Sequence, residues 1–410
     1  MRRRPAPLSE QRLFRFLFLL QAFVLLINPK LLLHLDSNLG NILQKLLIIL
    51  CGAALMATRP VRRGVVVLIA AIVVLTLLCA MCSEFPQFQW RLYVGGVVSI
   101  VAPFVLLTAA PREPDRVLGL VVFASLPLLM TVFGGLYQLA GISPLFNAET
   151  TGGGTRLAGT QGIPAFLAAA SFTSTFAALE LAERRHLGYA FLLFVDLIIL
   201  LLAGGRMAFG AAVLVCGIDY LRSFKRVPLL KLFLPIWTLV VGGILLTTFA
   251  EDNLRHLQST SLNREIIWAP LIHQLHVHPW FGVGLGNQQQ LLHVAGAITT
   301  MAGHNEYLRL AVELGYPGAI LFFALTLGIV LLVWNSTWVG RDPMFLVCAA
   351  AFYMYGVTDN TFSMPQSYFI LAAASFAGRP KSLRSPVPAF ETAPPHPSTH
   401  GADLARPKVS

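Results

Sequence analysis

Apolar runs of roughly 20 residues, separated by short polar segments, follow one another along most of the chain. A helix needs about 20 consecutive apolar residues to cross the hydrocarbon core of a bilayer. Strands of a membrane barrel would instead alternate apolar and polar positions over about ten residues. The pattern therefore predicts an all-α membrane protein, a polytopic bundle of about twelve transmembrane helices. The predicted spans lie near residues 13–33, 41–58, 64–82, 93–110, 117–141, 163–182, 187–203, 207–221, 229–249, 317–335, 344–357 and 366–378.

Composition agrees with this class and predicts an orientation. The residues are 56% hydrophobic and 12% charged, about half the charged fraction of soluble domains. The net charge of +11 does not predict nucleic-acid binding, because the chain has no basic stripe interleaved with aromatic residues. Lys and Arg gather in every second loop, which the positive-inside rule assigns to the cytoplasm together with both termini. These residues are Arg59, Arg62, Arg63, Arg112, Arg116, Arg184, Arg185, Arg222, Lys225, Arg226 and Arg341.

The C-terminal segment and the cysteines carry no predicted chemistry. Residues 378–410 hold seven prolines and little apolar clustering, and such a segment cannot bury enough surface to offset the entropy of ordering. We therefore expect a membrane domain over residues 1–377 and a disordered cytoplasmic tail over 378–410. The five cysteines lie in or beside apolar runs, where Cys behaves as a small hydrophobe, so we expect neither a disulfide nor a metal site.

Residues 250–316 form the one sizeable polar island between the predicted spans. A membrane protein that gathers its ionisable side chains in one loop is expected to carry its function there. Apolar residues at helical spacing (Ile266, Ile267, Leu271 and Leu275) predict an amphipathic helix over 262–277, interrupted at Pro270. A second helix is expected to begin near His304 and to close at Gly315 and Pro317.

Three loops on the predicted outer side each contribute an arginine. Arg156 lies in the glycine-rich loop 142–162, and Arg206 ends the tight turn Gly204-Gly205-Arg206 between two spans. Arg264 lies in the central loop. Because the outer side is otherwise poor in basic residues, this convergence is the main indication that the three loops share one site.

Several of these segments resemble the bacterial O-antigen ligase and polymerase superfamily. The matching residues are Gly303-His304-Asn305-Glu306-Tyr307-Leu308 with Glu313-Leu314-Gly315, His278-Pro279 through Gly286-Asn287, Gly204-Gly205-Arg206, and Arg156-Leu157-Ala158-Gly159. They are similar to the family's His-Asn signature, its Pro-x-x-Gly-x-Gly segment, its arginine turn and its Arg-x-x-Gly, and Arg264 stands where the family has an arginine. The likeness covers roughly residues 150–325. The chain departs from it at Gln161-Gly162-Ile163-Pro164, where Gly-Asn-Pro is commoner.

The resemblance implies an O-antigen ligase of lipopolysaccharide biosynthesis, a metal-independent, inverting glycosyltransferase without a cofactor, whose periplasmic catalytic loop is 250–316. The donor would be a glycan on undecaprenyl diphosphate and the acceptor the lipid A core, at the periplasmic face of the inner membrane. Guanidinium groups bind phosphate bidentately and stabilise a departing diphosphate, which is the catalytic role expected for Arg206 and Arg264. His304 is the expected general base. Arg156, Asn305 and Glu306 are expected to bind substrate.

Each of these arginines also has a plain structural interpretation. Arg206 suits an interfacial anchor that reaches lipid headgroups, and Arg156 suits a solvated charge in a flexible glycine loop. Arg255 and Arg309 are expected to be surface charges.

The residues around His304 have structural alternatives as well. His304 and Asn305 suit a helix start, with Asn305 as the cap. Glu306 and Glu313 suit either partners that support the site residues or ordinary residues of a polar helix face. Asp359 and Asn360 fall in the last outer loop, close enough to join the site. A metal site is not expected, because no carboxylate or cysteine completes the group His273, His276 and His278.

Two relatives of a ligase share these motifs: an O-antigen polymerase, whose acceptor is another lipid-linked repeat, and an O-linked protein oligosaccharyltransferase. A lipid-linked glycan transporter belongs to a different class. Transport would place polar residues along a path at mid-membrane, whereas the predicted spans are nearly free of charge apart from Asp196 and a few flanking groups. The pattern favours transfer over transport.

Overall fold

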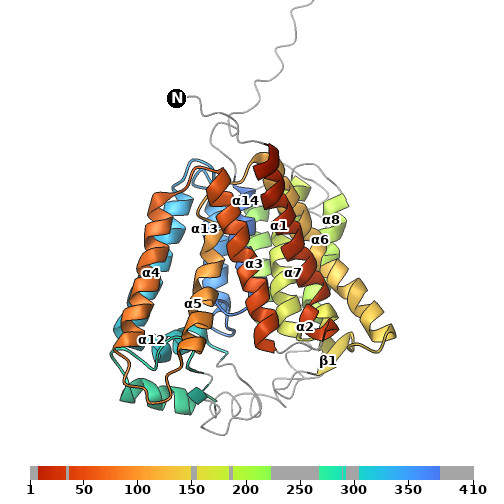
Figure 1. The fold of residues 1–410 in the computed structure, drawn as a ribbon. Helices are drawn as coiled ribbons and strands as arrows, with labels where there is room; N and C mark the ends of the chain where they lie inside the picture. The colour runs from red at the N-terminus through yellow and green to blue at the C-terminus, as the bar shows by residue number, and fades with distance from the viewer. Residues whose placement is uncertain are drawn as a thin grey trace, which may run out of the picture.

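The computed structural model describes residues 8–33, 37–148, 155–183, 188–222, 267–288, 290–291 and 304–378. Most of these residues are helical, and the long helices pack side by side in one bundle (Figure 1). The helices are α1 (Leu8–Ile27), α2 (Pro29–Leu32), α3 (Ser37–Thr58), α4 (Arg63–Met81), α5 (Trp90–Val105), α6 (Glu113–Leu139), α7 (Pro164–Glu183), α8 (Gly188–Leu202), α9 (Arg206–Arg222), α12 (Glu306–Trp334), α13 (Pro343–Tyr355) and α14 (Pro365–Ala377).

Successive long helices run in opposite directions, so the connections alternate between two ends of the bundle (Figure 1). We call the end at which α1 begins and α14 finishes the terminal end. The opposite end, at which α7 and α12 begin, is the loop end. This alternation is the one that the apolar pattern predicted, and it places Arg156, Arg206 and His304 together at the loop end.

Five of the described helices are long and apolar enough to cross a membrane: α3, α4, α6, α7 and α12. Three further apolar helices, α5, α8 and α13, are shorter. Every predicted span within the described residues coincides with a helix, and the predicted span at 229–249 lies outside them. An all-α membrane protein is therefore supported, while the number of spans remains a prediction.

The centre of the bundle is built from small side chains and the edge from large apolar ones. In α7, 83% of the apolar window is buried inside the protein, whereas in α4 the share is 28%. Helix α7 is rich in Ala, Ser and Thr, which allow close approach of neighbouring helices without a large side chain between them. Helix α4 is largely Val, Leu and Ile, and its outward face suits lipid.

Ionic and polar contacts join the helices at the terminal end. The buried carboxylate of Asp115 accepts a hydrogen bond from Arg15 Nε at 2.7 Å and pairs with Arg59 at 3.2 Å. Nearby, Arg116 Nε donates to the carbonyl of Phe376 at 2.8 Å, which ties α6 to the last turn of α14. Basic residues thus gather at one end of the bundle, as the loop pattern predicted.

Two features correct the sequence-based expectations. In the outer loop 142–162 the described residues include two short antiparallel strands, β1 (Phe146–Ala148) and β2 (Thr155–Leu157), and Arg156 lies on β2. Helix α3 carries Lys45, which is buried and donates to Ser99 Oγ of α5 at 2.7 Å. The burial of this charge inside the predicted span 41–58 was not expected from the sequence.

We expect Asp115→Asn to destabilise the protein by roughly 2 kcal/mol, because it leaves the buried Arg59 without a counter-charge. Thermal unfolding in detergent would show a lowered midpoint. Glu113→Gln is the matched control, since Glu113 lies on the same helix but its side chain is 51% exposed. Equal midpoints for the two variants would contradict the assigned role of Asp115.

Candidate functional site

The first nine residues of α12 form a separate short helix, as predicted. Asn305 caps it, because its side-chain Oδ1 accepts a hydrogen bond from the backbone N–H of Leu308 at 3.0 Å. The helix ends at Gly315, whose φ of 72° and ψ of 171° are non-helical. The apolar remainder of α12 continues from there in a new direction. We call residues 306–314 the capped helix.

The segment Pro279-Trp280-Phe281-Gly282-Val283-Gly284 closes the other end of the capped helix. The kink at Gly315 leaves carbonyls at the helix end without intrahelical partners. The backbone N–H groups of Val283 and Gly284 donate to the carbonyls of Val312 and Glu313, each at 2.9 Å. The family-like glycine segment is thus a clamp for the helix that follows His304.

The glycines of this segment are required by positive φ and close backbone approach. Gly282 has φ 67°, and a Cβ there would lie 2.5 Å from the backbone of Glu313. Gly286 has φ 81°, and a Cβ there would lie 2.2 Å from the carbonyl oxygen of Leu92. Any larger residue would push the segment away from the capped helix or from α5.

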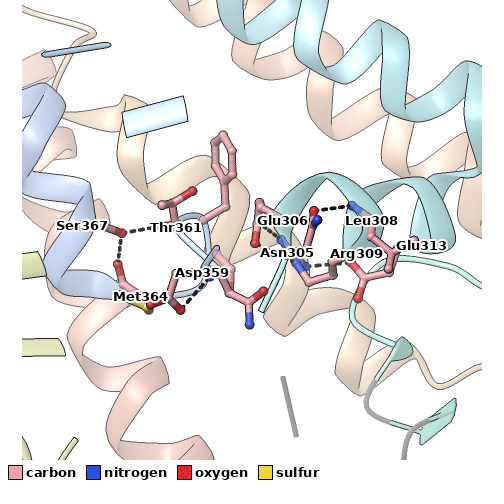
Figure 2. Close-up of polar contacts among 12 residues, drawn as sticks. Asn305, Glu306, Leu308, Arg309, Glu313, Asp359, Thr361, Met364 and Ser367 are labelled. Carbon is pink, nitrogen blue, oxygen red and sulfur yellow. Dashed lines mark hydrogen bonds and ion pairs between the residues drawn. The ribbon is translucent and has the colours of Figure 1, made fainter. Parts of the chain in front are cut away.

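Arg309 lies at the centre of the capped helix and is buried, so the expectation of a surface charge is wrong. Its guanidinium pairs with Glu306 through two hydrogen bonds, and with Glu313 at 2.8 Å (Figure 2). The backbone N–H groups of Gly286 and Gln288 also donate to Glu313. All three charged side chains are at least 93% removed from solvent. Their pairing offsets the cost of burying charge.

His304 directly precedes this helix and faces the loop after α13. Its Nδ1 lies 3.8 Å from Asp359 Oδ1, and its side chain is 34% exposed. Backbone contact fixes the two segments together, since the N–H of Glu306 donates to the carbonyl of Gly356 at 2.8 Å. His304 has φ 45°, an uncommon conformation for a residue with a side chain. The imidazole is therefore accessible and held beside a carboxylate.

The arginine loops form a second group at the loop end. Arg156 lies on β2, and its side chain runs across Gly204, where a Cβ would lie 2.7 Å from Arg156 Cδ. Gly204 has φ 67° and lies two residues before the start of α9 at Arg206. The structure thus brings together two arginine motifs that are about 50 residues apart in the sequence.

The first turn of α7 joins the arginine group to the histidine group. On one side, Gly205 packs so closely on Ala168 that a Cβ at Gly205 would lie 2.5 Å from it. On the other, the hydroxyl of Tyr355 lies 3.3 Å from both the Ala165 carbonyl and Asp359 Oδ2. Ala165 and Ala168 are one helical turn apart, so both groups rest on the same surface.

The divergent segment 159–163 has a bracing role. Gln161 is buried, donates to the carbonyl of Leu25 at 2.8 Å and accepts from Gln366 Nε2 at 2.7 Å. Asn28 Nδ2 donates to the carbonyl of Thr160 at 3.0 Å. These bonds tie the approach to α7 to α1 and α14. A side chain with both a donor and an acceptor is needed at position 161.

The central loop is described in part. Residues 267–277 are helical, with Ile267, Leu271 and Leu275 buried against Val312, as the periodicity predicted. The helix continues through Pro270, so the expected interruption there is not observed. Arg264, Arg255 and the helix start predicted at 262 lie outside the described residues. Within the described residues, His, Cys, Asp and Glu form no group of three suited to a metal ion.

Sequence reasoning missed the ion pairs of Arg309 and the buried Lys45. A signal existed, because Glu306, Arg309 and Glu313 are spaced by three and four residues, which is the spacing of ion pairs on a helix. Their burial could not be inferred, since it depends on residues 283–288 and on neighbouring helices. Asp359 was included only as a possible neighbour, and its contact with His304 confirms that proximity.

We expect Arg309→Met to destabilise the protein by about 3–5 kcal/mol, since it leaves two buried carboxylates unpaired. The triple variant Arg309→Met, Glu306→Gln, Glu313→Gln removes the charges together and should recover most of the thermal midpoint. Arg206→Met is the control for loss of an exposed arginine. A triple variant no more stable than Arg309→Met would rule out unpaired charge as the cause.

The comparisons with known proteins agree with this placement. No curated protein matches the chain. A family model described as O-antigen ligase matches residues 189–323, which include α8, α9, the clamp segment and the capped helix. The matched region therefore contains the arginine turn and the histidine group that the fold brings to one end of the bundle. Residues 189–323 of the chain are therefore similar to the O-antigen ligase family.

Proposed function

We propose that the protein is an O-antigen ligase, which transfers a glycan from undecaprenyl diphosphate to the lipid A core. The observation that carries the proposal is that both groups meet the start of α7. The Gly204-Gly205 turn packs on Ala168, and His304 is linked to the Ala165 carbonyl through Asp359 and the Tyr355 hydroxyl. One group suits proton transfer and the other suits phosphate binding. A transferase with a lipid diphosphate leaving group needs both within reach of one substrate.

The arginine group suits the diphosphate. Guanidinium groups bind phosphate oxygens bidentately and stabilise the negative charge that grows as the glycosidic bond breaks. Arg206 is exposed at the loop end, and the Arg156 side chain runs across Gly204, two residues before Arg206 in the same turn. We assign the leaving group to these two residues, and to Arg264 from its place in the family-like pattern. These arginines would supply the positive charge that other enzymes obtain from a bound metal ion.

The histidine group suits the acceptor. In the proposed step the acceptor hydroxyl oxygen attacks the anomeric carbon, opposite the diphosphate. The bond from that carbon to the phosphate oxygen breaks, its electron pair leaves with undecaprenyl diphosphate, and His304 takes the hydroxyl proton. Asp359 would hold the imidazole in orientation. Attack from the opposite face inverts the anomeric configuration.

Asn305 and Glu306 act through the helix in this proposal. Asn305 uses its side-chain oxygen to cap the helix, and the carboxylate of Glu306 is 1% exposed and bonded to Arg309. Both side chains are thus occupied in holding the helix that positions His304. We therefore assign them a positioning role instead of direct contact with a sugar. We include the periplasmic face of the inner membrane as the place of reaction, because the loop end is the end opposite the basic cluster.

We expect purified protein to move glycan from undecaprenyl diphosphate to lipid A core in excess chelator. His304→Ala, Arg206→Ala and Arg264→Ala should each lower the rate at least about a hundredfold, the usual cost of losing a general base or an electrostatic stabiliser. Arg91→Ala, an exposed arginine at the loop end, is the control. Glycan transfer would be followed by gel mobility of the acceptor.

The outcomes separate the related activities. Growth of the lipid-linked chain without core labelling would make the protein a polymerase, and labelling of protein would make it an oligosaccharyltransferase. Movement of lipid without covalent transfer would refute the proposed class. Full activity of His304→Ala would remove the general-base assignment and leave the arginines unaffected.

We expect Asp359→Asn to lower kcat by roughly tenfold or more with a smaller change in KM, because Asp359 orients His304 without touching the donor. Initial rates over a range of acceptor concentrations would measure both constants. Asp342→Asn, at the other end of α13, is the control. An Asp359→Asn effect confined to KM would refute the orienting role.

A further inference from the structure

An aromatic tip projects from the loop end beside α4 and α12. Trp280 is 69% exposed and Phe281 is 47% exposed, although both follow the well-packed helix 267–277. They lie in the clamp segment before its donors Val283 and Gly284, and neither the core nor the proposed chemistry uses their side chains. Burying large aromatic side chains is strongly favourable, and their joint exposure therefore requires an explanation.

The tip is fixed at the level where two candidate spans begin or end. The N–H of Tyr316 donates to the carbonyl of Pro279 at 2.8 Å, directly before the apolar part of α12. A Cβ on Gly315 would lie 2.4 Å from the carbonyl oxygen of Trp280. On the other side, Ser83 Oγ donates to the carbonyl of Gly282 at 2.9 Å, just after the end of α4. The tip cannot move independently of α4 and α12.

The surface next to the tip is apolar along both helices. Exposed residues include Val67, Val74, Leu78 and Met81 on α4, and Ile320, Leu321, Leu327 and Leu331 on α12. Both helices are candidate membrane spans, so their outward faces are covered by lipid tails when they cross a bilayer. Tyr316 and Trp90, which are also exposed, lie at the loop end of α12 and α5. Trp and Tyr at the ends of membrane spans mark the headgroup region.

We propose that Trp280 and Phe281, with Tyr316 and Trp90, insert into the headgroup boundary of the phospholipid bilayer. The tip then ties helix 267–277, which lies crosswise beneath α4 and α12 (Figure 1), to the membrane surface. Because the tip continues into the clamp that holds the capped helix, insertion fixes the height of His304 above the bilayer. This role of the aromatic tip does not depend on which acceptor the protein uses.

The test measures the depth of the tip in the full-length protein in phosphatidylcholine–phosphatidylglycerol nanodiscs. Nitroxide labels would be placed by Trp280→Cys and Phe281→Cys in a Cys82→Ser background, since the other cysteines are buried. Gln87→Cys, exposed in the loop between α4 and α5, is the control. Power saturation with oxygen and with a nickel chelate should give a severalfold higher oxygen-to-nickel ratio at 280 and 281 than at 87.

A second measurement uses the native side chain and needs no label. Lipids that carry bromine near the headgroup end of their tails should quench a larger fraction of the tryptophan fluorescence in the wild type than in Trp280→Phe. Lipids with bromine deep in their tails should quench the two proteins to the same extent. Equal accessibility at 280 and 87 would overturn the proposal, and so would equal quenching of the two proteins. A label at 280 reached by neither reagent would also overturn it, because the tip would then be packed against protein.

Discussion

The pairing of Arg309 with Glu306 and Glu313 is the interaction on which the loop end depends. A guanidinium at this depth is unstable without compensation, and two carboxylates on the same helix supply it. The three residues make the capped helix a rigid block whose charges balance internally. The ammonium of Lys45 faces the same group and interacts with both Arg309 and Glu306. The Lys45 amine donates to Ser99 and so joins α3 to α5.

A rigid block of this kind positions a side chain at its end with little freedom. His304 precedes the cap by one residue, and the bond from Glu306 to Gly356 docks the helix start on the loop that carries Asp359. At the other end, the clamp segment supplies the backbone donors that the kink at Gly315 requires. The glycines of this clamp allow its backbone to come close to the end of the helix. Their spacing is therefore set by the geometry of that helix end, and they do not form a flexible hinge.

Small residues perform the complementary task at α7. Ala165 and Ala168 leave its first turn bare enough for the Gly204-Gly205 turn to settle on one side and for Tyr355 to reach the backbone on the other. A larger residue at position 168 would push the Gly204-Gly205 turn away from α7. The bundle therefore brings the two chemical groups together through close packing of a central helix, whereas the outer helices α4 and α12 keep large apolar faces for lipid.

The sequence by itself determined the helical membrane class, the alternation of loops between two ends and the residues of the candidate site. Each of these follows from local patterns: the length of apolar runs, the bias of Lys and Arg, and glycine or asparagine at a helix end. Only the tertiary structure decided that Arg309 is buried, that Arg156 lies across Gly204 and that Asp359 faces His304. The last two of these facts join segments about 50 residues apart in the sequence. Whether a charge meets water or a counter-ion is set by which helices pack around it, and a local pattern contains no information about that.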